Sequence, residues 1–172
     1  MINQFFPSYT IGADAYDSVP GICVAFGTTA VLIGGEKSRA AAEPALRKSC
    51  EGKLEILGSF QYGDNSTFEA AAALEAITEV QQADMIFAVG GGRAVDTAKI
   101  AAEHLDKPIF TFPTLCSNCA PVTAVCVVPE ASGVSHLHQY GGGAPFAEGL
   151  FLGRHRRRPV EAVRGAFLRP RR

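Results

Sequence analysis

The chain has 172 residues, 47% of them hydrophobic and 19% charged, with a formal net charge of −1. This length suffices for one globular domain with a normal core. No run of about 18 apolar residues occurs, which excludes a membrane-spanning helix, and the start lacks the features of a secretory signal peptide. The five cysteines, an odd number, fit the reducing cytoplasm, where we expect the protein to reside.

Charge is divided unevenly along the chain. Residues 1–128 contain eight Lys and Arg against fourteen Asp and Glu, whereas residues 129–172 contain eight Arg, no Lys and three Glu. The two parts therefore carry balances of −6 and +5. This difference predicts an α/β domain over residues 1–128 and a basic, irregular tail over residues 129–172.

The first half of the chain predicts a short edge strand, followed by helices and strands in alternation. Pro20 suits the first turn of a helix that stops at Gly27, and Pro44 predicts a kink or a late start in the next helix. The expected elements are an edge strand over 9–11, helices over 14–26 and 36–49, and strands over 30–33 and 54–60.

The second half continues this alternation. Ser66 and Glu69 have the spacing of a capping box, which predicts a helix that continues through Val80. The other expected elements are strands over 85–89, 108–112 and 123–128 and a helix over 93–105. Strand and helix thus alternate four times, which is typical of an α/β fold, a Rossmann-like parallel sheet with helices on both faces.

Three consecutive glycines, Gly90, Gly91 and Gly92, join an apolar strand to the next helix. Without Cβ atoms they let the backbone approach a ligand, and the free N–H groups of a helix start can seat a phosphate. Two alternatives stay open: the glycines serve the turn geometry alone, and Asp96 is a first-turn carboxylate facing the helix dipole. Lys99 either meets a phosphate or forms an ordinary helix pair with Asp96.

Small and hydroxyl residues follow three of the predicted strands. Gly34 and Gly35 follow the first, the three glycines follow the second, and residues 113–117 follow the third. In parallel sheets, ligands bind beyond the carboxyl ends of the strands. We therefore expect a nucleotide site at this edge.

Two motifs resemble signatures of the iron-containing alcohol dehydrogenase superfamily, and within it the glycerol dehydrogenase branch. The first runs from Gly90 to Lys99, and the second, FPTLCSNCAP, runs from Phe112 to Pro121. The similarity covers residues 9–128. It implies an NAD-dependent oxidoreductase that acts on the CH–OH group of a polyol or another small alcohol.

The resemblance also implies which residues bind the cofactor. The pyrophosphate would lie on the glycine loop, the nicotinamide half against the two loops that follow, and the adenosine ribose near the end of an earlier strand. The implied residues are Gly35, Gly90, Gly91, Gly92, Arg93, Asp96, Thr114, Ser117, Thr123 and Val125.

Three positions depart from the family pattern. Gly35 stands where a carboxylate usually accepts from the ribose hydroxyls, so Glu36 substitutes for it or the contact is lost. Cys119 stands at the glycerol-contacting aspartate, and a thiol is a poor acceptor, which favours another alcohol as substrate. Pro129 replaces an aromatic residue of the family.

The family's chemistry also uses a divalent metal, zinc or iron, bound by residues of a C-terminal helical domain. No aspartate occurs around Arg169, where the family has a ligand, and we interpret His136, His138 and His155 as solvated tail histidines. We therefore assign no metal ligand and no catalytic residue. The sequence predicts a truncated chain that lacks this domain, and one hypothesis is a change of reading frame near residues 129–140.

Other interpretations remain open. The arginine clusters of the tail could bind nucleic acid through phosphates, although little aromatic interleaving makes solvated arginines the simpler interpretation. A dehydroquinate-synthase-like lyase would share the fold. Cys116 and Cys119 could form half of a zinc site or a redox pair. Because no second pair stands at zinc spacing, a structural zinc is disfavoured. Apolar surface exposed by a missing domain would favour homo-oligomers.

Overall fold

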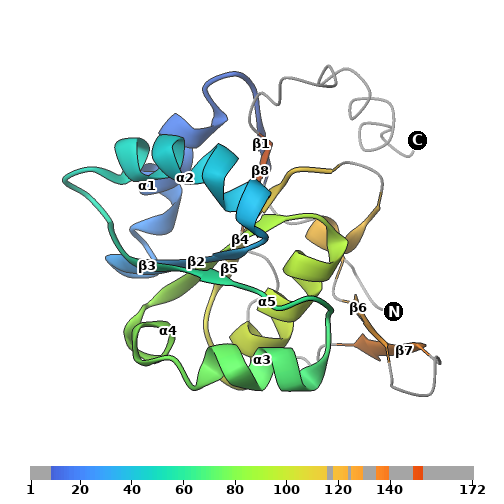
Figure 1. The fold of residues 1–172 in the computed structure, drawn as a ribbon. Helices are drawn as coiled ribbons and strands as arrows, with labels where there is room; N and C mark the ends of the chain where they lie inside the picture. Colours follow the sequence, from blue (N-terminus) through green and yellow to red (C-terminus); the bar gives the residue numbers. More distant parts are fainter. Residues whose placement is uncertain (1–8, 116–117, 124, 130–134, 140–148, 153–172) are drawn as a thin grey trace, which may run out of the picture.

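A computed structural model describes residues 9–115, 118–123, 125–129, 135–139 and 149–152 (Figure 1). Within this part of the chain, six parallel strands form the main sheet and two antiparallel strands form a separate small sheet. The main sheet contains, from one edge to the other, β1 (Tyr9–Ile11), β8 (Gly149–Leu152), β5 (Ile109–Pro113), β4 (Met85–Gly90), β2 (Thr29–Gly34) and β3 (Glu55–Gln61). The small sheet contains β6 (Val125–Pro129) and β7 (Ser135–Gln139).

Helices cover both faces of the main sheet (Figure 1). Two helices lie on one face and three on the other, and each layer has its own apolar core. The first layer contains α1 (Val19–Cys23) and α2 (Glu36–Cys50), preceded by the 3₁₀ turn η1 (Ala15–Ser18). The second contains α3 (Phe68–Glu75), α4 (Thr78–Gln82) and α5 (Gly92–His104). A second 3₁₀ turn, η2 (Ala120–Val122), follows β5.

The central strands divide their side chains between these two cores. Leu32 and Phe87 belong to the core under α2, whereas Val31 and Ile86 belong to the core under α5. Successive side chains of a strand point to opposite faces, so an unbroken apolar run fills both layers. The predicted Rossmann-like parallel sheet with helices on both faces is confirmed.

Two predicted helices are each divided in two. The helix expected over 14–26 is the short η1 followed by α1, with Pro20 in the first turn as predicted. The helix expected through Val80 breaks after Glu75, where Ile77 has an extended conformation and α4 begins. By contrast, α2 begins at Glu36 and continues through Pro44.

The capping box is wrong in detail. Thr67, not Ser66, caps α3, since its hydroxyl accepts a hydrogen bond from the backbone N–H of Ala70 at 3.2 Å. The Ser66 side chain is buried and donates to the carbonyl oxygen of Val127 at 2.7 Å. Ser66 therefore ties the loop before α3 to β6, a contact between residues 61 positions apart.

The structure also differs from the expectation that no regular element follows Val128. β7 pairs with β6, and β8 pairs with β5 and β1 inside the main sheet. These strands have five and four residues, respectively, and neither belongs to the alternation of strands and helices that predicted the earlier strands. The arginine clusters of residues 154–158 and 169–172 lie outside the described residues. None of the described helices has the length and apolar character needed to cross a membrane.

At the amino end of the sheet, Asp84 joins two central strands. One of its carboxylate oxygens accepts hydrogen bonds from the backbone N–H of Thr28 at 2.8 Å and from the N–H and hydroxyl of Thr29, both at 2.9 Å. The chain passes closely enough that a Cβ on Gly27, whose φ is +146°, would lie 2.3 Å from the Asp84 Cβ. Hydrogen bonds from Thr28 and Thr29 lower the pKa of Asp84.

This lowered pKa predicts a pH dependence of stability. The stabilisation is fully present above the ordinary aspartate pKa of about 3.9 and is lost as the pH falls through the lower folded-state pKa. Asp84→Asn should therefore unfold at lower urea than the wild type near about pH 6, and this difference should shrink below about pH 4. Urea unfolding across this pH range measures it.

Asp17→Asn is the matched control, because Asp17 is exposed and its carboxylate contacts no hydrogen-bond donor among the described residues. It should give only a small difference near about pH 6. A stability gap for Asp84→Asn that stays constant with pH would contradict the assigned hydrogen bonds.

Candidate functional site

Three loops meet at the carboxyl edge of the main sheet. β2, β4 and β5 are adjacent, and their last residues pair across the sheet: Gly34 with Val89, and Gly90 with Pro113. The N–H of Thr114 donates to the carbonyl oxygen of Gly90 at 3.0 Å, which joins two of the loops directly. The alternation of strands and helices in the sequence predicted that these strand ends lie at one edge of a parallel sheet, and the structure has this arrangement.

Gly90 is required by the backbone itself. Its φ is +149°, a conformation that other residues rarely adopt, and an added Cβ would lie 3.0 Å from the Cβ of Ala94 and 3.3 Å from the hydroxyl of Ser38. Ser38 belongs to α2, so the turn after β4 packs against the helix that follows β2. Geometry alone therefore explains the first of the three glycines.

The next two glycines have an ordinary backbone and another reason to be small. Gly91 has a φ of −85°, and an added Cβ would lie 3.1 Å from Leu115 Cδ1. A Cβ on Gly92 would lie 3.0 Å from Asn118 Nδ2. The neighbouring loop thus lies close over these glycines. Leu115 is 57% exposed, so its side chain has room to move.

The start of α5 has no side-chain cap. Gly91 is the N-cap residue and offers no side-chain oxygen to the first N–H groups of the helix, which need a partner from outside the helix. Arg93 is exposed, and its guanidinium donates to the backbone carbonyl of Asp64 at 3.3 Å. An uncapped, glycine-led helix start with an adjacent cation is suited to an anionic group.

Asp96 and Lys99 form a buried charged pair one turn further along α5. Asp96 is 5% exposed and Lys99 1%. Lys99 Nζ lies 3.5 Å from Asp96 Oδ1. Burial raises the pKa of Asp96 and lowers the pKa of Lys99, and the opposite charge of each partner works against both shifts. Asp96 lies beyond the first turn of α5, which contains no acidic residue, so the alternative of a first-turn carboxylate facing the helix dipole is wrong.

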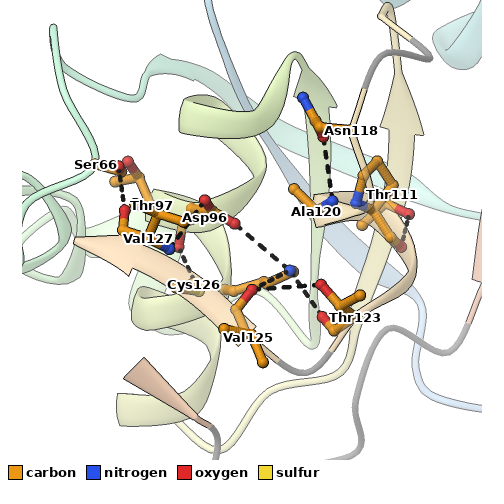
Figure 2. Close-up of polar contacts among 12 residues, drawn as sticks. Ser66, Asp96, Thr97, Thr111, Asn118, Ala120, Thr123, Val125, Cys126 and Val127 are labelled. Carbon is orange, nitrogen blue, oxygen red and sulfur yellow. Dashed lines mark hydrogen bonds and ion pairs between the residues drawn. The ribbon is translucent and has the colours of Figure 1, made fainter. Parts of the chain in front are cut away.

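The other polar contacts of this pair reach the backbone near β6 (Figure 2). Lys99 Nζ donates to the carbonyl oxygens of Thr123 at 2.8 Å and Val125 at 3.2 Å. Asp96 Oδ2 accepts from the N–H of Val127 at 3.2 Å. Within the described residues, Asp96 Oδ1 accepts no hydrogen bond. Of the two roles predicted for Lys99, the helix pair with Asp96 is present. It differs from an ordinary surface pair because it is buried and also holds the backbone of another segment.

Apolar packing holds the same segment. Cys126 and Val128 are buried against Ile100 and Ala101 of α5, and the Cys126 thiol donates to the Asp96 carbonyl at 3.4 Å. Burial on one face of β6 follows from strand alternation, so the side chain of Val127 points outward and is 45% exposed.

The remaining predicted residues lie in different places. Gly35 is the N-cap of α2, where a Cβ would make only ordinary contacts of 3.6 Å with Ser38 and Tyr62. Thr114 is half-buried after β5, and Cys119 is exposed before η2. Ser117, together with Cys116 of the suggested redox pair, lies outside the described residues.

Three residues near the glycine loop were not predicted from the sequence to be part of the site. Ser38, Leu115 and Asn118 all lie against glycines of the two strand-end loops. Leu115 and Asn118 belong to the FPTLCSNCAP motif, so the motif itself was a signal for them. Ser38 carries no signal in the sequence, because only the pairing of β2 with β4 brings it to Gly90.

A metal centre is not formed by the described residues. No group of three or more His, Cys, Asp or Glu side chains in this part of the chain is arranged to hold a metal ion. Of the three histidines interpreted as tail residues, His155 lies outside the described residues. His136 is on β7 with an exposed side chain.

Comparison with known families matches residues 7–141 to the family described as iron-containing alcohol dehydrogenase. The glycerol-1-phosphate dehydrogenase (NAD(P)+) of Methanoculleus marisnigri is 29% identical over 125 residues, which are 72% of this chain and 34% of that protein. The glycerol dehydrogenase of Thermotoga maritima is 33% identical over 72 residues, which are 42% of this chain and 20% of that protein. This chain thus matches about a third or less of the length of these curated relatives.

A solved structure has the same arrangement of elements. The glycerol dehydrogenase from Schizosaccharomyces pombe superimposes with a TM-score of 0.74 at 18% identity. The superposition covers 89% of this chain and 39% of that one. At this identity the likeness concerns the fold.

Gly90 and Gly35 offer a matched pair of substitutions. Gly90→Ala places a Cβ in a strained conformation against Ala94 and should lower the free energy of unfolding by about 1–3 kcal/mol. Gly35→Ala should stay within about 0.5 kcal/mol of the wild type, because the lost helix-capping preference and the reduced freedom of the unfolded chain oppose each other. Urea unfolding of the three proteins measures this, and equal losses for both variants would contradict it.

Proposed function

The chain belongs to the iron-containing alcohol dehydrogenase family, and we propose that it is the dinucleotide-binding part of an NAD-dependent oxidoreductase. The proposed reaction is oxidation of the CH–OH group of a polyol or another small alcohol. One observation carries the proposal: the glycine turn after β4 leads into the uncapped start of α5 at the edge where β2 and β5 also end. This is the place where open parallel sheets bind dinucleotides.

The pyrophosphate is proposed to lie on Gly91 and Gly92. The donors offered there are backbone N–H groups without a side-chain cap, and the partial positive charge of the helix start favours an anion. Arg93 adds a cation with an exposed side chain. A Cβ atom at either glycine would occupy space next to the backbone and prevent the close approach that a phosphate needs. The residues present therefore fit the cofactor.

The nicotinamide half is proposed to meet Thr114, Thr123 and Val125, with Ser117 from the same loop. The backbone of Thr123 and Val125 is held beside α5 by Lys99. Asp96 is proposed to belong to the cofactor site through Lys99. Its Oδ1 lies 3.5 Å from the Lys99 ammonium, and its Oδ2 accepts a hydrogen bond from the N–H of Val127.

At the adenosine end, Gly35 provides no carboxylate for the ribose hydroxyls. Glu36 is the adjacent carboxylate and is exposed in the first turn of α2. We propose that Glu36 takes this contact. The M. marisnigri relative is named as using NAD or NADP, and a carboxylate here favours NAD over its 2′-phosphorylated form.

The proposed substrate is a small alcohol, as in the names of the relatives. Cys119, at the position implied to contact it, is exposed and offers a thiol in place of a carboxylate. This favours an alcohol that needs no strong acceptor there. In the family, a bound divalent metal lowers the pKa of the alcohol hydroxyl. The described residues contain no set of ligands for that metal, so no step is assigned to it here.

A cytoplasmic location is part of the proposal. Cys23 and Cys50 are buried thiols without a disulfide, which suits a reducing compartment. Burial raises the pKa of both thiols, and this keeps them in the unreactive protonated form.

NAD binding tests the proposal directly. Isothermal titration of the whole chain with NAD should show saturable binding, and Gly91→Val should abolish it, because a branched side chain would cover the backbone donors of the loop. Gly91 has an extended backbone, and its Cβ contact is the exposed and movable Leu115. The variant should therefore still fold.

Gly21→Val is the matched control, since a Cβ at Gly21 meets nothing within 4 Å. It should bind NAD like the wild type. Equal heats for the wild type and Gly91→Val would rule out the glycine loop as the binding site.

A further inference from the structure

The most unusual feature outside the glycine loop is the position of two charges inside the protein. Lys99 is among the largest fully buried side chains, and Asp96 is almost as deeply buried. Moving an ammonium from water into a protein interior costs several kcal/mol, and a buried pair often stabilises a protein no better than apolar residues of the same size. Stability alone is therefore a weak reason for this pair.

The pair provides a defined geometry. A lysine ammonium has three N–H donors, and Lys99 directs them toward the carbonyl oxygens of Thr123 and Val125 and toward the Asp96 carboxylate. Asp96 in turn accepts from the N–H of Val127. Three backbone groups from a stretch of five residues are thus held by two side chains one turn apart on α5 (Figure 2).

We propose that Lys99 is a positioning residue for the cofactor: with Asp96 as its counter-ion, it fixes the Thr123 and Val125 backbone where the nicotinamide half is bound. This inference rests on the proposed function. The single helix α5 would then position both the pyrophosphate and the nicotinamide half of the dinucleotide. Its first turn carries Gly92 and Arg93, and its second and third turns carry the pair.

This role separates two parts of the cofactor. Lys99 lies seven positions after Gly92, which corresponds to about 10 Å along a helix that rises 1.5 Å per residue. The pyrophosphate seat depends on backbone N–H groups of the first turn, which do not involve Lys99. Loss of the ammonium should therefore weaken contacts of the nicotinamide half and leave contacts of the pyrophosphate and adenosine unchanged.

ADP-ribose, which lacks the nicotinamide, makes this difference measurable. The whole chain is titrated calorimetrically with NAD and separately with ADP-ribose. Lys99→Met, which preserves the length of the side chain but removes its charge, should weaken NAD binding about tenfold or more and change ADP-ribose binding less than about twofold. The ratio of the two affinities is the readout, because a general loss of structure would lower both.

Lys99→Met leaves Asp96 buried without its cation, and this can destabilise the chain. Lys99→Met/Asp96→Asn removes both charges and keeps the shape, so it provides a second folded test. Urea unfolding verifies that each variant is folded before titration. The double variant should show the same selective loss of NAD binding, since the Thr123 and Val125 carbonyls have lost their donor in both.

Lys107 is the matched control. Its ammonium also donates to backbone carbonyls, those of Gln81 and Ala83, but before β4 at the opposite edge of the sheet. Lys107→Met should lower stability without changing the ratio of NAD to ADP-ribose affinity. This control separates the general effect of losing a lysine-to-carbonyl contact from an effect on the nicotinamide half.

The outcomes distinguish the two proposals. The positioning role is wrong, and the dinucleotide site stands, under two conditions. The wild type binds both NAD and ADP-ribose, and the two Lys99 variants either keep both affinities or lose both equally. If the wild type binds neither ligand, the proposed function fails and the positioning role fails with it. Selective loss of NAD binding in the Lys99 variants alone supports both.

Discussion

The structure depends on one backbone constraint, the tight turn at Gly90 that connects β4 to α5. β4 is buried along its whole length and has a neighbour on each side. The chain must leave this strand and turn back over the sheet immediately, and it does so with a φ of +149° at Gly90. This turn decides where α5 starts, which face it covers and which residues surround its first turn.

Much of the site follows from that placement. With α5 fixed, its apolar side chains form the core against β2 and β5, and its other side packs on β6. The loop after β5 then lies over Gly91 and Gly92 through Leu115 and Asn118. The helix therefore joins two surfaces that the main sheet alone would not connect: the strand-end loops and the small sheet of β6 and β7.

The polar groups inside this assembly serve geometry more than stability. Ser66, Asp96 and Lys99 are buried, and each directs its polar atoms to the backbone of residues 123–127. Such directional contacts specify the position of the short peripheral strand β6. The apolar packing of Cys126 and Val128 specifies it less well, because hydrophobic packing is not directional. A binding surface that includes Thr123 and Val125 would gain a defined shape from them.

The order of the residues was sufficient to establish the layers of the fold and the edge at which a ligand is proposed to bind. Residues 85–89 are all apolar, and an unbroken apolar run of this length is typical of a strand that is buried on both faces of a sheet. Local rules also located the turn at Gly90 and the long helix α2. What the folded chain alone decided are contacts between distant residues: Ser66 with Val127, Lys99 with Thr123, and the pairing of β8 with β5. A lone lysine or a four-residue strand has no period in the sequence, and its environment arises only when segments far apart along the chain come together in the tertiary structure.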